Sequence, residues 1–183
     1  MASSTTTYEN VHSCTPLEAL RLVITRGGRG AVHKLGNWPE PRHQVLAWLD
    51  GRGAASAVAI VRAQVRDFLA ASKLSISADL IDDVVLCTSE VVTNALVHTE
   101  SRIVVVRLVT LADAARGAVV TAAVGDEDCT RPVKRPSEQD CAAAVNGRGL
   151  ALLTALSRWG CRTWGGGKDV WFVCPLPEPS SQI

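Results

Sequence analysis

The chain has almost no net charge, because 19 lysines and arginines stand against 18 aspartates and glutamates among 183 residues. That balance provides no field for non-specific binding to nucleic acid or to a membrane surface, and no DNA-binding motif is visible. No stretch of about 18 uncharged apolar residues occurs, which excludes a transmembrane helix. Residues 1–7 are polar, so we expect no secretory signal and a cytoplasmic protein without membrane association.

Clustered cysteines are also lacking. The six cysteines are scattered without a C-x-x-C pair, and no cysteine and histidine residues have the spacing of a zinc site. A chain of this length forms a core without disulfide bonds. We therefore interpret the cysteines as reduced thiols that serve mostly as small interior hydrophobes.

The remaining composition, 47% apolar and 20% charged, is ordinary for a globular domain and excludes wholesale disorder and fibrous repeats. We expect a partly disordered N-terminal extension over residues 1–40, a domain over 41–176 and a C-terminal tail over 177–183. Within the extension, Leu17, Leu20 and Ile24 predict a short helix over 16–24. The G-G-R-G tetrad after it is interpreted as a flexible linker, because no clear helix follows to make a phosphate-binding loop.

Hydrophobic periodicity predicts helices and strands in separate groups after residue 40. Ser56 and Ser77 are the expected N-caps of two successive helices. The expected elements are a strand over 43–49, helices over 56–72 and 77–98, strands over 103–109 and 118–124, a helix over 149–156, and strands over 161–164 and 169–174. A loop of some 20 residues, 126–147, separates the second hairpin strand from the last helix. Segregated helices and antiparallel hairpins favour a two-layer α+β sandwich.

The second of these helices carries a carboxylate and an amide on one face. Glu90 and Asn94 are four residues apart, so their side chains lie one above the other, among apolar neighbours. Polar groups in such surroundings are costly unless they have partners. The pair can hold a hard cation and accept a proton from a hydroxyl group. A hydrogen-bonded pair at the surface would have the same spacing.

Two further groups flank the long loop. Asp126 ends an apolar strand, where it is either a turn former or an acceptor for an exocyclic amine in an apolar pocket. Gly147, Arg148, Gly149 and Leu150 open the last helix. Glycine lets the backbone approach a ligand, and free N–H groups at a helix start bind anionic oxygens. Neither a P-loop nor a Rossmann fingerprint is present.

The order of these parts resembles the Bergerat-fold, or histidine-kinase-like, ATPases. The segments D-D-V-V-L-C-T-S-E-V-V-T-N-A-L-V-H and G-R-G-L-A-L-L-T-A-L-S-R-W-G are similar to the small anti-sigma-factor serine/threonine kinases of that superfamily. The resemblance runs from Gln44 to Pro175. It implies a two-layer sandwich in which helices cover one face of a mixed, mainly antiparallel sheet.

The resemblance also implies roles for the singled-out residues. Glu90 takes the position of the general base, and Asn94 that of the Mg²⁺ ligand that bridges to the phosphates of ATP. Asp126 takes the position of the aspartate that reads adenine. The nucleotide-binding glycine box against the phosphates corresponds to Gly147, Arg148, Gly149 and Leu150, with the arginine available to neutralise charge.

The chain departs from the family pattern at two places. The usual D-x-G-x-G box is replaced by a glycine-free segment, Asp126-Glu127-Asp128-Cys129-Thr130. In the C-terminal strand, Asp169 stands where threonine is common. Both departures bear on ATP affinity and turnover more than on the fold.

Three functions follow. The first is a serine/threonine kinase that transfers phosphate from Mg-ATP to a protein antagonist (anti-anti-sigma-like) and binds a sigma factor or similar regulator; the resemblance also suggests a homodimer. The second is a catalytically weak or inactive nucleotide-binding module that sequesters a partner, which the missing glycines favour. The third, a plain ATPase, ranks last because no transducer domain is recognisable in the sequence.

Overall fold

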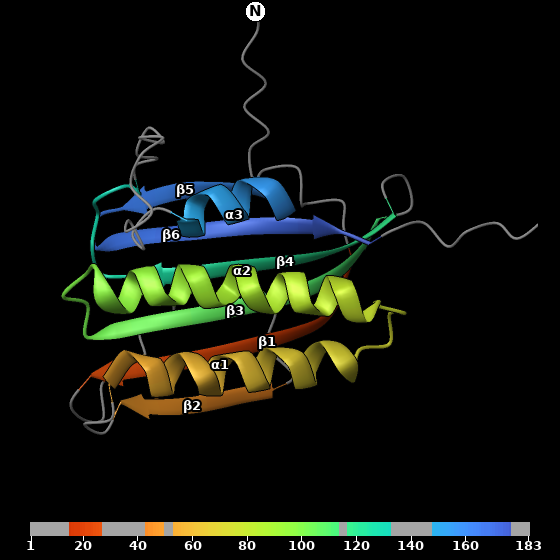
Figure 1. Ribbon diagram of the computed structural model, residues 1–183, viewed down its shortest axis with the longest axis horizontal. Coiled ribbons are helices and arrows are strands. Elements are labelled where there is room, and N and C mark those ends of the chain that lie inside the picture. The colour runs from red at the N-terminus through yellow and green to blue at the C-terminus, as the bar shows by residue number, and fades with distance from the viewer. Residues whose placement is uncertain (1–14, 27–42, 50–52, 114–116, 133–147, 177–183) are drawn as a thin grey trace, which may run out of the picture.

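Three helices cover one face of a six-stranded sheet in the computed structural model (Figure 1), which describes residues 15–26, 43–49, 53–113, 117–132 and 148–176. The strand order is β2-β1-β3-β4-β6-β5. Only β1 and β2 are parallel; every other neighbouring pair is antiparallel. The predicted α+β sandwich with a mixed, mainly antiparallel sheet is therefore confirmed.

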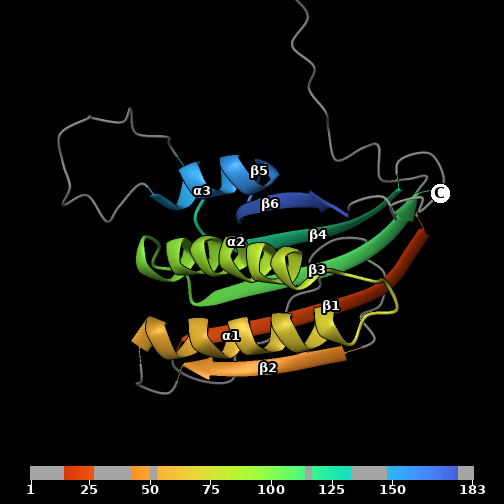
Figure 2. The same cartoon turned by 45° about the vertical axis from the view of Figure 1, so that its right-hand side comes forward.

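The strands are β1 (Thr15–Arg26), β2 (His43–Leu49), β3 (Ile103–Asp113), β4 (Gly117–Asp126), β5 (Arg158–Trp164) and β6 (Gly167–Pro175). The helices are α1 (Gly53–Ala70), α2 (Ala78–Val97) and α3 (Arg148–Leu156). Helix α1 lies over the β1–β2 edge and α3 over the β5–β6 edge, as the turned view also shows (Figure 2). None of the described helices combines the length and apolarity needed to span a membrane.

Helix α2 begins and ends where the sequence predicts. The Ser77 hydroxyl accepts a hydrogen bond from the Leu80 N–H at 3.3 Å, as an N-cap does. His98 is the C-cap, and its N–H donates to the Asn94 carbonyl at 3.0 Å. In contrast, Ser56 is not the N-cap of α1, because that helix begins at Gly53, whose φ of 79° favours glycine.

The helix expected over residues 16–24 is wrong, because this segment is β1. Leu20, Leu22 and Ile24 face the helices and are buried, while Val23 is buried on the opposite face. A strand covered on both faces has no clean apolar–polar alternation, so its pattern resembles that of a buried helix. The sheet thus begins before the expected domain start at residue 41. The other extension residues, 1–14 and 27–40, and the tail 177–183 lie outside the described residues.

The main core fills the space between the helices and the sheet. Helix α1 contributes Val61, Val65 and Leu69, which are four residues apart, whereas Arg62 and Arg66 on its outer side are exposed. Helix α2 packs against both α1 and α3. This arrangement leaves the polar face of α2 that carries Glu90 and Asn94 only partly covered, next to α3.

Strands β4 and β6 come unusually close at one end. Asp126 is the register partner of Lys168, and the preceding residue, Gly167, is buried against the backbone of Asp126. A Cβ atom at position 167 would overlap the Asp126 carbonyl oxygen, which is main chain and cannot swing aside. Glycine is therefore required here for the strands to pair as they do.

We predict that Gly167→Ala destabilises the protein by about 3 kcal/mol or more, because the clash forces β4 and β6 apart. Thermal unfolding followed by circular dichroism would then show a melting temperature lower by about 6–12 °C for a chain of this size. Gly165→Ala is the matched control, since nothing lies within 4 Å of a Cβ atom at that position. Equal melting temperatures for the two variants would contradict the close approach of the strands.

Candidate functional site

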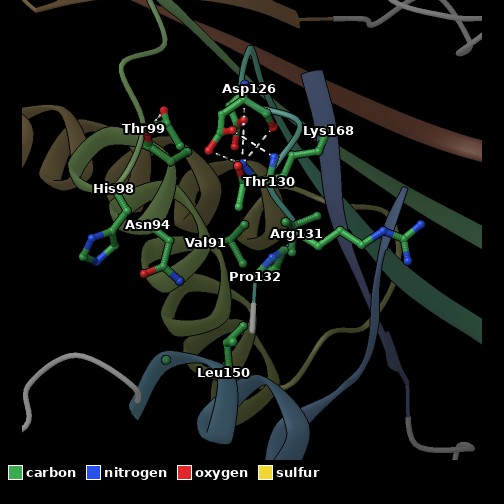
Figure 3. Close-up of a pocket in the computed structure, with 14 residues that line it drawn as sticks. Val91, Asn94, His98, Thr99, Asp126, Thr130, Arg131, Pro132, Leu150 and Lys168 are labelled. Atoms are coloured by element: carbon green, nitrogen blue, oxygen red, sulfur yellow. Dashed lines mark hydrogen bonds and ion pairs between the residues drawn. The ribbon is translucent and has the colours of Figure 1, made fainter. Parts of the chain in front are cut away.

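A cavity of about 380 Å³ lies where α2, α3 and the paired ends of β4 and β6 meet (Figure 3). Asn94 of α2 lines it, together with Gly149 and Leu150 of α3 and Asp126 and Lys168 of the strands. In Figure 3, Asp126 and Lys168 lie together at one end and Leu150 at the other, with Asn94 between them. Its volume falls within the range of small-molecule sites.

The start of α3 packs tightly against the polar face of α2. A Cβ atom at Gly149 would lie 2.7 Å from Glu90 Oε2 and 3.6 Å from Asn94 Nδ2. Gly149 is buried, while Glu90 and Asn94 are partly exposed. The glycine thus permits the N-terminus of α3 to lie close to the Glu90 carboxylate and the Asn94 amide. A larger residue at position 149 would fit only if Glu90 moved.

The other end of the cavity is closed by a buried ion pair. Lys168 Nζ donates to Asp126 Oδ1 at 2.9 Å, and the two residues are only 6% and 4% exposed. The Asp128 N–H donates to the same oxygen, also at 2.9 Å. Burial raises the pKa of the Asp126 carboxyl above its ordinary value, and the hydrogen bonds from Lys168 and Asp128 oppose that rise.

The acidic residues after Asp126 do not leave unpaired charge in the cavity. Glu127 accepts hydrogen bonds from the backbone N–H groups of Arg102 and Ile103, at 2.6 and 3.2 Å, which ties it to the start of β3. Asp128 Oδ2 lies 3.3 Å from Lys168 Nζ. The hydrogen bond from the Thr130 N–H, 2.8 Å long, is the main reason that the pKa of Asp128 is lowered. The glycine-free segment therefore folds into a turn that Lys168 holds in place.

The Asp169 side chain lies on the face of the sheet opposite the cavity. It forms a partly buried ion pair with Arg107 of β3, and neither residue lines the cavity. Burial raises the pKa of the Asp169 carboxyl, and the Arg107 charge opposes the rise. Because alternate residues of a strand point to opposite faces, Lys168 and Val170 are the residues that β6 presents to the cavity. The aspartate in place of threonine thus adds no charge to it.

The structure brings together most of the residues singled out from the sequence. Asn94, Asp126, Gly149 and Leu150 line one cavity, and Glu90 lies against Gly149. Gly147 and the side chain of Arg148 lie outside the described residues.

Sequence reasoning missed Lys168. A signal was present in the sequence: Lys168 falls in the same alternating set of strand positions as Val170, Phe172 and Cys174, all of which are buried. A lysine in that phase predicts a buried cation that needs an anionic partner. Which carboxylate supplies the partner depends on the β4–β6 register, which the sequence does not give.

The interior thiols expected from the sequence are found at Cys87 and Cys174, which are buried in the main core. Burial raises the pKa of Cys87 to about 11 and that of Cys174 to about 12, so both are neutral and unreactive at physiological pH. Cys161 is half-buried and Cys129 exposed, and all four are free thiols. Cys14 and Cys141 lie outside the described residues.

The oxygen donors near Gly149 suit a magnesium ion that is shared with a nucleotide. Mg²⁺ prefers oxygen ligands, keeps several waters and is held by one or two side chains plus substrate phosphates. Glu90 Oε2 is the oxygen nearest to Gly149, and Asn94, one turn away, turns its Nδ2 toward Gly149, so that a flip of the amide would offer its Oδ1. Among the described residues no group of three or more His, Cys, Asp and Glu forms a self-sufficient metal site. Glu90 and Asn94 would together supply two ligands, which fits a metal ion whose other ligands are water and a bound substrate.

Comparisons with known proteins place the chain in a family. The family model of the histidine kinase-like ATPase domain matches residues 53–173, which include α1, α2, β4, α3 and all of β6 except its last two residues. A comparison with curated proteins gave no match.

Two solved structures are similar over 68% of the chain. The crystal structure of the RsbU and RsbW domains of Rv1364c from Mycobacterium tuberculosis is 27% identical, with a TM-score of 0.47. The histidine kinase domain of the blue-light activated histidine kinase from Erythrobacter litoralis EL346 is 17% identical, with a TM-score of 0.40. The matched region spans 30% of the first of these chains and 61% of the second. The family model covers well over half of the sequence, and the chain belongs to the histidine kinase-like ATPase domain family.

Proposed function

We propose that this protein binds Mg-ATP in the cavity and transfers the terminal phosphate to a serine or threonine of a protein antagonist. One observation supports the proposal most: Asn94, Asp126 and the start of α3 come from three separate elements and meet around one cavity. These are the residue types that a nucleotide needs, in the order that the family uses. ATP binding is also what membership of the family supports.

The base would bind at the closed end. Asp126 is buried there, and the cavity is lined by the apolar side chains of Val91, Ala95 and Val170 as well as by Thr99 and Thr130. An ionised carboxylate only accepts hydrogen bonds, so it selects a donor such as the adenine amine. Apolar walls around one directional polar group are typical of sites that recognise a flat heterocycle.

The phosphates would bind at the start of α3. The first N–H groups of a helix have no partners within the helix, and the helix dipole favours negative charge there. Asn94 would hold the magnesium ion, which would neutralise charge on the phosphates. Because Gly149 has no side chain, the phosphates can approach the helix start as closely as Glu90 does.

Glu90 would act as the general base. It would accept the proton of the attacking serine or threonine hydroxyl while the new oxygen–phosphorus bond forms and the bond between the β- and γ-phosphates breaks, releasing ADP. Phosphoryl transfer depends mainly on positioning and charge stabilisation, so one well-placed carboxylate next to the phosphate site suffices. The position of Glu90 against Gly149, at the start of α3, supports this role.

The choice of a protein substrate, and of a sigma factor or similar regulator as the binding partner, rests on the sequence resemblance of α2 and of the segment from α3 into β5. Those segments resemble the corresponding segments of the small anti-sigma-factor kinases in sequence, and they occur in the same order along the chain. A homodimer and a cytoplasmic location belong to the same proposal.

A second candidate is a binding module that sequesters its partner with little or no phosphotransfer. The observation in its favour is that one oxygen of Asp126 already carries two hydrogen bonds, from Lys168 and Asp128, in a segment without glycine. A preformed, rigid turn at the base site would restrict how a nucleotide enters. The experiments on ATP binding and on Glu90 distinguish the two candidates.

We predict micromolar, Mg²⁺-dependent binding of ATP and ADP, measured by calorimetric titration. Asp126→Asn should weaken binding by about tenfold or more, or about 1.4 kcal/mol, because the amide offers the adenine amine a poorer acceptor. Asn94→Ala should remove the Mg²⁺ dependence. Unchanged affinity in both variants would contradict the assignment of the site.

We predict that Glu90→Ala abolishes phosphotransfer while leaving the ATP dissociation constant within about threefold, because the base acts on the hydroxyl and not on the nucleotide. The test incubates the protein with radiolabelled ATP and antagonist proteins purified from the same organism. Label that appears on a serine or threonine of an antagonist with the wild type, but not with Glu90→Ala, supports the kinase. If the wild type binds ATP but transfers no label, the sequestering module is favoured instead.

We predict that Gly149→Ala lowers Mg-ATP affinity by about tenfold while changing the melting temperature by less than about 3 °C. The new methyl group would displace only the mobile end of Glu90, and alanine is the better helix former. Gly165→Ala again serves as the control, because its Cβ atom meets nothing within 4 Å. A Gly149→Ala variant that binds Mg-ATP like the control would contradict the close approach of the phosphates to α3.

A further inference from the structure

Lys168 has no hydrogen left for a ligand. An ammonium group has three donors. Its Nζ donates to Asp126 Oδ1 at 2.9 Å, to the Asp128 carbonyl at 3.0 Å and to Asp128 Oδ2 at 3.3 Å. With 6% of its surface exposed, it is also shielded from solvent. Whatever Lys168 does in the cavity, it does through the two aspartates.

Asp126 is held so that its two oxygens differ. Both of its hydrogen bonds, from Lys168 Nζ and from the Asp128 N–H, go to Oδ1. Among the described residues no hydrogen bond reaches Oδ2, and Asp126 lines the cavity. The pairing thus fixes the carboxyl group by one oxygen and leaves the other for a bound molecule.

We propose that Lys168 is a positioning residue that sets base selectivity: by keeping Asp126 as a carboxylate, it makes the base site an acceptor, which selects a purine with a 6-amino group over one with a 6-carbonyl group. The inference rests on the proposed ATP site and adds to it the residue that makes the site specific. A carboxylate can only accept, whereas a neutral carboxyl group could also donate to a carbonyl oxygen.

The charges around Asp126 make this role necessary. Burial raises the pKa of Asp126, and the hydrogen bond from Lys168 is the largest effect that lowers it. The nearby charge of Asp128 raises it further. The other charged or titratable residues that line the cavity are His98, the C-cap of α2, and Arg131 of the segment after β4. Burial and, to a lesser degree, the Asp126 charge raise the pKa of Cys161 in β5, and Arg107 and Asp169 lie paired on the opposite face of the sheet. Without Lys168, the hydrogen bond from the Asp128 N–H is the one effect left that lowers the pKa of Asp126, so that pKa would rise further.

The experiment measures dissociation constants of ATP and of inosine triphosphate, which has a 6-carbonyl group, by calorimetry at about pH 6, 7 and 8. The two ligands share the triphosphate, so their ratio cancels effects of His98 or Arg131 on the phosphates. The wild type should prefer ATP by about tenfold or more at every pH. Lys168→Met should lose most of that preference, and the loss should be larger at pH 6 than at pH 8, because a higher pKa of Asp126 leaves more of the neutral carboxyl at the lower pH.

Lys168→Arg is the matched control, because it keeps the charge next to Asp126. It should show a pH-independent preference for ATP even if its affinity is lower overall. A Lys168→Met variant with the wild-type ratio at all three pH values would overturn the inference, and so would a loss of ATP and inosine triphosphate binding in equal measure at every pH.

The wild type alone also tests the inference, should Lys168→Met not fold. A preference for ATP that collapses between about pH 8 and 6 in the wild type would show that Lys168 does not keep Asp126 ionised. If the wild type binds neither nucleotide, the proposed function fails and the inference fails with it. If it binds ATP but Lys168 has no effect on selectivity, only the inference fails.

Discussion

The buried ion pair between Lys168 and Asp126 is the interaction on which the cavity depends. A buried pair of this kind contributes little net stability, because desolvation offsets the attraction, but removal of one partner leaves an uncompensated charge. The pair forms only because β4 and β6 are in register at these two residues and because Gly167 lets the strands approach. One ion pair therefore links the end of the cavity at Asp126, the turn that follows this residue and the end of the sheet.

The two ends of the cavity use different physics. At the Asp126 end, a directional acceptor lies in apolar, buried surroundings, which suits recognition of a base by shape and hydrogen bonding. At the α3 end, partly exposed polar groups and a helix N-terminus suit anionic phosphates and a hydrated cation. Glycines permit a close approach at both ends: a Cβ atom at Gly167 would overlap the backbone of Asp126, whereas one at Gly149 would require the end of the Glu90 side chain to move.

Much of the fold could be predicted, because α2 carries its own caps and the strands after it have continuous apolar patterns. The hydrophobic pattern wrongly predicted a helix at β1, because a strand buried on both faces lacks the apolar–polar alternation by which strands are recognised. The candidate site residues Glu90, Asn94, Asp126 and Gly149, which lie in or against one cavity, were singled out through their order along the chain. Lys168 was not, because its proposed role arises from strand pairing across the sheet. The position of Glu127 also depends on a tertiary contact, since its carboxylate accepts hydrogen bonds from the backbone at the start of β3.

The most direct test of the central claim is a crystal structure of the protein with Mg²⁺ and a non-hydrolysable ATP analogue. We expect the adenine amine within hydrogen-bond distance of Asp126 Oδ2, with Lys168 still bonded to Oδ1, and the phosphates at the start of α3 beside Asn94. An analogue bound elsewhere, or a base that displaces Lys168 from Asp126, would contradict the claim that this ion pair builds the base site.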